Sequence, residues 1–84
     1  MSDDQEQLVI SRRNEILGLW AADLLGKRGE SADQFVRQMQ AVYGLRNRDI
    51  DMINVLVKQL AGLASIQEID AMLEAARMQA LVEL

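Results

Sequence analysis

The chain has 84 residues, half of them hydrophobic, with 13 acidic and 9 basic side chains and a formal net charge of −4. This length suits one small domain with a limited core, and the acidic balance argues against a nucleic-acid partner, because phosphate binding favours a basic surface. The absence of His and Cys removes the commonest metal ligands and the commonest general base, so we expect no metal, no cofactor and no catalytic residue.

Glycines divide the chain into four predicted helices. The chain contains no Pro, and four glycines, Gly26, Gly29, Gly44 and Gly62, each lie at the end of a periodic apolar segment, where a C-terminal cap is expected. The predicted helices cover about residues 4–25, 32–43, 48–61 and 66–82. Because the connections are short, successive helices should be neighbours in an all-α, compact four-helix bundle that forms a single domain over residues 1–84.

The first predicted helix has an apolar face that holds the only Trp. Four residues recur at helical spacing on this face: Ile16, Leu17, Trp20 and Leu24. We expect Trp20 to be a buried core residue between this helix and the third or fourth one. Asn14, Glu15 and Asp23 are expected to point away from that face. Gly18 costs about 1 kcal/mol inside a helix, so it indicates close approach of a neighbouring helix.

The opening of the first helix is expected to contribute least to the core. The residues ahead of Arg12 should be dispensable for packing, and residues 1–10 should be prone to fraying. Arg12 and Arg13 have two interpretations. They are solvated charges on the helix, or they contact a protein partner together with Leu8.

The second and third predicted helices differ in their start signals and in their apolar content. Ser31 followed by Gln34 is a capping-box pattern and predicts the start of the second helix. Asn47 is the predicted cap of the third helix. The third helix is apolar around most of its circumference, so we expect it to be the most buried of the four.

The fourth predicted helix begins with the strongest capping box of the chain, Ser65 with Glu68. Its apolar stripe consists of Ile66, Ile69, Leu73, Ala76 and Ala80. Because the stripe ends in alanines, close helix packing is expected there. The apolar cluster near the C-terminus has two open interpretations, weak self-association and fraying, and it consists of Met78, Leu81, Val82 and Leu84.

The turn after the first helix is the only candidate for ligand chemistry. Lys27 and Arg28 precede the second helix, whose N-terminus could favour an anion beside them. The alternative is a plain helix–helix turn, because the spacing of a phosphate-binding loop is missing. Asp49 and Asp51 are two apart on a helix and so point in different directions, which does not favour acid–base catalysis.

The segment Arg12–Ala22, RRNEILGLWAA, resembles a run like ARRN(K)LLGLWAA that opens the folded part of a known protein family. That family is the zeta subunit, the small ATPase inhibitor of the alphaproteobacterial F-type ATP synthase. The resemblance is close from Arg12 to Gly29 and looser beyond it. There the junction Gly62–Ile69 is similar to the family's Gly, short linker, Ser cap and final helix.

The resemblance implies a non-catalytic regulatory subunit that docks on the catalytic head of the ATP synthase. Family members carry a Phe- and Arg-bearing arm ahead of the arginine pair, which is held to enter the head and block rotation. Residues 1–7 contain no Phe and no Arg, so we expect a short member that lacks the usual arm and inhibits weakly or not at all. The alternative is a free-standing helical interaction module or homo-oligomer that has lost inhibitory activity.

The expected location follows from the absence of targeting segments in the sequence. No apolar run approaches the length of about 18 residues that is typical of a membrane span, and the N-terminus has no signal-peptide pattern. We therefore expect a cytoplasmic chain without direct membrane insertion. The resemblance further implies a place peripheral to the inner membrane, reached through the ATP synthase.

Overall fold

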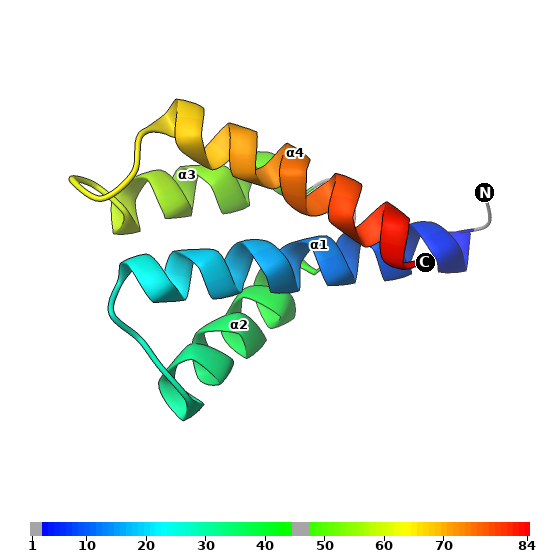
Figure 1. The fold of residues 1–84 in the computed structure, drawn as a ribbon, viewed down its shortest axis with the longest axis horizontal. Coiled ribbons are helices and arrows are strands. Elements are labelled where there is room, and N and C mark those ends of the chain that lie inside the picture. The colour runs from blue at the N-terminus through cyan, green and yellow to red at the C-terminus, as the bar shows by residue number, and fades with distance from the viewer. Residues whose placement is uncertain (1–2, 45–47) are drawn as a thin grey trace.

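Four helices follow one another among residues 3–44 and 48–84, the part of the chain that this computed structural model describes. They are α1 (Asp3–Leu24), α2 (Glu30–Tyr43), α3 (Asp49–Gln59) and α4 (Ile66–Glu83). The helices pack into a body of 38 × 28 × 22 Å (Figure 1). The predicted all-α, four-helix architecture is confirmed.

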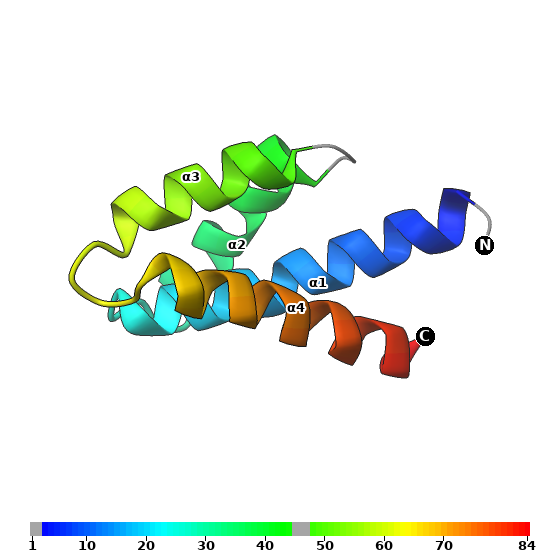
Figure 2. The ribbon, with the colours of Figure 1, turned by 90° about the horizontal axis from the view of Figure 1, so that it is seen from above.

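Helix α1 lies between α2 and α4 and packs along both of them (Figure 1). Helix α4 runs antiparallel to α1, and α3 packs against α4 and α2. The start of α1 and the end of α4 therefore lie at the same end of the molecule (Figure 2). The α1–α2 turn and the α3–α4 loop lie at the opposite end.

The central helix is α1, and the prediction that the third helix is the most buried was wrong. Ile50 on α3 is 77% exposed, and the buried residues of α3 are Met52 and Leu56. Side chains of all four helices, with one residue that follows α3, form the core: Leu17, Ala21, Met39, Met52, Leu56, Leu60, Ile69 and Ala76. Helix α1 packs extensively against both α2 and α4, whereas α3 makes smaller contacts with its two neighbours and leaves part of its apolar surface in solvent.

Small residues allow the close approach of α2 to α1. A Cβ on Gly18 would lie 3.2 Å from Val36 Cγ2 and 3.3 Å from Met39 Sδ. The predicted packing reason for Gly18 is therefore confirmed. Trp20, by contrast, is only partly buried, although it packs against the core, so the prediction of a buried core residue was too strong.

The opening of α1 contributes to the core, contrary to expectation. Val9 and Ile10 are buried, and so is Asn14, which was expected to point away from the apolar face. These positions share a face with Leu17 because their spacings of three to four residues return to the same side of a helix. The predicted fraying within residues 1–10 stays a prediction.

Two glycines with positive φ set the turn between α1 and α2. Gly26 has φ 75° and follows the end of α1, as predicted. Gly29 has φ 57° and is the N-cap of α2, so its prediction as a C-terminal cap was wrong. Glycine adopts such angles without steric cost, and α2 consequently begins at Glu30. Ser31 thus lies inside the first turn, and its predicted role as the cap was wrong. The predicted cap Asn47 lies outside the described residues.

The capping box at the start of α4 is confirmed in both directions. The Glu68 amide donates to Ser65 Oγ at 3.1 Å, and the Ser65 amide donates to Glu68 Oε1 at 2.9 Å. Two amides that have no partner within the helix are thereby satisfied. Ala76 and Ala80 further along α4 are fully buried, in agreement with the expected close packing.

Replacing Ser65 with alanine should lower the free energy of unfolding by about 0.5 to 2 kcal/mol, because the Glu68 amide loses its acceptor. Chemical denaturation measures this change. Ser31→Ala is the matched control, since Ser31 is exposed and does not occupy the N-cap position. Equal effects of the two substitutions would contradict the assignment of the cap to Ser65.

Candidate functional site

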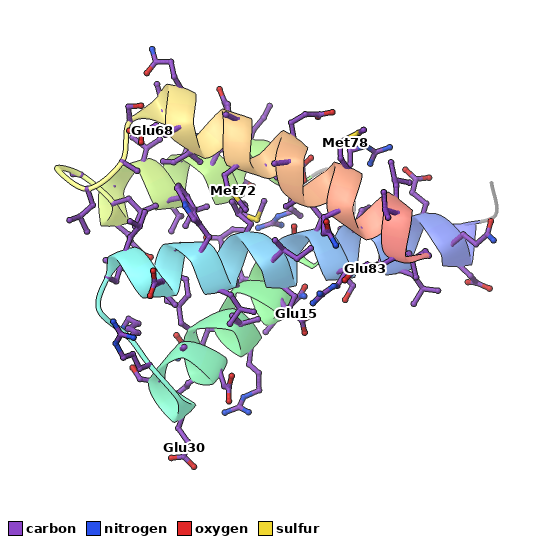
Figure 3. The ribbon with its side chains drawn as sticks, viewed as in Figure 1. Glu15, Glu30, Glu68, Met72, Met78 and Glu83 are labelled. Carbon is purple, nitrogen blue, oxygen red and sulfur yellow. The ribbon has the colours of Figure 1, made fainter. Side chains whose placement is uncertain are left out.

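The start of α1 and the end of α4 are joined by Arg12. Its Nε donates to Glu83 Oε2 at 2.6 Å and its Nη2 donates to Glu83 Oε1 at 2.9 Å, while Nη1 donates to Glu15. The side chains of Glu15 and Glu83, both labelled in Figure 3, lie near each other beside α1. The hydrogen bond from Arg12 holds the pKa of Glu83 below its usual value, and the bonds to Glu83 and Glu15 raise the pKa of Arg12. All three nitrogens of the guanidinium are therefore engaged within the chain.

Leu8 lies one turn before Arg12 and borders two shallow hollows. One hollow, of about 250 Å³, is lined by Gln5, Leu8, Val9, Leu81 and Leu84. The other, of about 380 Å³, is lined by Leu8, Ser11, Arg12, Glu15, Glu83 and Leu84. Leu8 is 55% exposed. The structure thus brings the predicted contact residues Leu8 and Arg12 together at one surface.

Arg13 faces the interior, and its interpretation as a solvated charge was wrong. Its side chain is almost completely buried. Nη2 donates to Asp49 Oδ1 at 2.7 Å and Nη1 donates to Asp49 Oδ2 at 3.1 Å. Nε and Nη2 also donate to Asn14 Oδ1, at 3.0 and 2.9 Å, and Asn14 Nδ2 donates to the Tyr43 carbonyl at 3.0 Å. This network links α1 to the end of α2 and the start of α3.

Two glutamines strengthen the same junction. Gln7 Nε2 donates to the Gly44 carbonyl at 2.6 Å, and Gln40 Nε2 donates to the Ser11 carbonyl at 2.6 Å. Both bonds connect the first half of α1 with the end of α2. The surface at Leu8 and Arg12 is therefore presented by a helix that is held on both sides.

Lys27 and Arg28 lie in the turn that follows α1. Lys27 is partly exposed and Arg28 is exposed, close to the start of α2. Glu30 and Asp33 in the first turn of α2 already place negative charge at that helix end. Anion contact at Lys27 and Arg28 stays a prediction.

Four aspartates that could have formed an acidic cluster are not gathered in one pocket. Asp23, Asp33 and Asp51 are exposed, and Asp49 is paired with Arg13. Among residues 3–44 and 48–84, no group of three or more His, Cys, Asp or Glu side chains could hold a metal ion.

Four residues of these networks were not recognised as partners in the sequence: Asn14, Glu15, Asp49 and Glu83. Asn14 and Glu15 had usable signals, because Asn14 lies three residues before Leu17 on the buried face and Glu15 lies three residues after Arg12, where opposite charges pair. Asp49 and Glu83 pair across the fold with arginines on α1, which no local pattern indicates.

Comparison with protein families gives a match over almost the whole chain. The model described as ATPase inhibitor subunit zeta matches residues 1–83. Comparisons with curated proteins and with solved structures gave no match. In the part of the chain that the structure describes, no helix combines the length and apolar character needed to cross a bilayer.

Proposed function

Because this chain belongs to the ATPase inhibitor subunit zeta family, we propose that it docks on the catalytic head of the ATP synthase and regulates the enzyme from there. The match over residues 1–83 is the observation that carries the proposal. Zeta inhibitors are non-catalytic regulatory proteins, and the chain is accordingly not an enzyme. The proposed partner is a protein, with no role for nucleic acid or for insertion into a membrane.

The proposed mechanism is steric. The start of α1 and the end of α4 extend together beyond α2 and α3 (Figure 1). This end carries Leu8 and Arg12, which would enter an interface of the catalytic head, while the wider part of the bundle limits how far the chain penetrates. Arg13 would act indirectly, since its buried side chain holds α1 against the start of α3.

Two finer features belong to the same proposal. The chain would be cytoplasmic and reach the inner membrane only through the synthase. Docking would persist with weak inhibition or none, because residues 1–7, which precede the arginine pair, contain neither Phe nor Arg.

The test uses a purified ATP synthase head from the same source as the chain. We expect the chain to bind the head in an interferometry assay and to slow ATP hydrolysis weakly or not at all. Leu8→Ser should weaken binding, whereas Leu63→Ser, at the opposite end of the molecule and similarly exposed, should not. Deletion of residues 1–10 is unsuitable here, because it removes the buried Val9 and Ile10.

Failure of the unmodified chain to bind the head would contradict the proposal. The free-standing interaction module or homo-oligomer would then be the better account. Sedimentation of the chain alone would distinguish these two, because a homo-oligomer formed through Met78, Val82 and Leu84 gains mass with concentration.

A further inference from the structure

Apolar side chains remain exposed where the start of α1 meets the end of α4. Leu8, Leu81 and Leu84 are 55%, 38% and 66% exposed, and Val9 lies buried beneath them. These four residues, with Gln5, line what we call the terminal hollow. Met78 lies on the side of α4 that faces away from α1 and is not part of it (Figure 3). A ligand that covers the terminal hollow would remove leucine surface from water, which is favourable.

The border of the terminal hollow is acidic. Asp4, Leu8, Arg12 and Glu15 follow one another at spacings of four, four and three, so they lie along one face of α1. Arg12 is the one cation among these residues, and its nitrogens are bound to Glu15 and Glu83. The guanidinium of Arg12 neutralises only one of the two carboxylates, so a net negative charge remains beside Arg12. The exposed carboxylate of Asp4 places a second negative charge on the opposite side of Leu8 along α1.

We infer that the terminal hollow binds an amphipathic helix of a partner protein, with leucine-like side chains on one face and Lys or Arg beside them. Leu8 and Glu15 are two turns apart, about 10 Å along α1, which matches two turns of a bound helix. Its apolar residues would contact Leu8 and Leu84, and its basic residues would lie near Glu15 and Asp4. The inference rests on the proposed function only for the identity of the partner, a segment of the synthase head.

Charge argues for a basic partner and against a second copy of this chain. Two copies joined through the terminal hollow would bring together two surfaces that each carry Asp4, Glu15 and Glu83, with Arg12 as the one cation among these residues. Like charges placed opposite each other disfavour association. A basic helix instead gains attraction from each of these carboxylates, and the net charge of −4 favours its approach at longer range.

The test uses a labelled synthetic helix of about 15 residues, near the length at which isolated helices become stable, with Leu on one face and Lys on the other. Fluorescence anisotropy measures its binding to the full chain. Leu8→Ser should weaken binding by about tenfold or more, as expected for loss of a buried leucine contact. Leu63→Ser should change it less than about twofold, because this exposed leucine lies at the opposite end of the molecule.

The charge requirement has its own controls. Asp4→Asn should weaken binding of the Lys peptide and reduce its salt dependence, whereas Asp23→Asn, exposed near the far end of α1, should do neither. A peptide with Glu in place of each Lys should not bind. Equal effects of Leu8→Ser and Leu63→Ser, or equal binding of the Lys and Glu peptides, would overturn the inference.

The outcomes for the inference and for the proposed function are separable. Binding of the Lys peptide at the terminal hollow without binding of the chain to the synthase head would leave the inference standing and remove the proposed function. Binding to the head that Leu8→Ser does not weaken, with no peptide binding, would overturn the inference and the role of Leu8 in the steric mechanism, and would leave docking on the head standing. Concentration-dependent dimerisation that Leu8→Ser abolishes would overturn the inference in favour of a second copy.

Discussion

Replacing Asn14 with alanine is expected to lower the free energy of unfolding by about 3 to 5 kcal/mol. Asn14 Oδ1 accepts from Nε and Nη2 of Arg13, and Asn14 Nδ2 donates to the Tyr43 carbonyl. The substitution therefore leaves a buried guanidinium nitrogen and a partly buried carbonyl without partners. An unsatisfied buried polar group costs about 1 to 3 kcal/mol, and a charged one costs more.

Chemical denaturation of the Asn14→Ala chain measures this effect. Asn54→Ala is the matched control, because Asn54 is exposed on α3 and surface substitutions usually change stability by less than about 0.5 kcal/mol. A loss below about 1 kcal/mol for Asn14→Ala would mean that water replaces the missing partners. The network would then not be the link between α1 and the α2–α3 junction.

The helix count and the start of α4 could be predicted because they depend on local interactions. The capping box of Ser65 and Glu68 is contained within four consecutive residues, and the left-handed conformations of Gly26 and Gly62 are typical of glycine after a helix. Gly29 was harder to interpret, since a glycine between two helices can end the first or begin the second. Its role as the N-cap of α2 moves the helix start ahead of Ser31.

The order of burial could not be predicted from hydrophobic content alone. Gly18, Ala21 and Ala22 have little apolar surface, but their small size lets a neighbouring helix approach α1 closely. Ile50, in contrast, is strongly apolar and remains exposed because no helix covers that side of α3. The number of neighbours that a helix has is a property of the tertiary arrangement and not of its own periodicity.

The candidate site was only partly predictable for a related reason. Leu8 and Arg12 are one turn apart, so their shared surface follows from helical spacing. The pairing of Arg12 with Glu83 joins residues that are 71 positions apart, and that of Arg13 with Asp49 joins residues 36 apart. Such pairs depend on how the helices pack. For the same reason, the burial of Arg13 was not evident beside the partly exposed Arg12.

Leu17→Ala is expected to lower the free energy of unfolding by about 2 to 5 kcal/mol. Leu17 is fully buried in the central helix and belongs to the core shared by the four helices. Truncation removes its apolar contacts and leaves a cavity that the helices on either side of α1 cannot easily fill.

The matched control for Leu17→Ala is Leu19→Ala, which changes the same residue type on the same helix. Leu19 is 43% exposed, so its truncation should cost well under half as much, and chemical denaturation compares the two directly. Since a domain of this size is stable by only about 5 to 15 kcal/mol, the Leu17 variant should be partly unfolded at moderate temperature and the Leu19 variant should not. Similar losses for both would mean that α1 does not present Leu17 to the core, and that its burial between α2 and α4 is wrong.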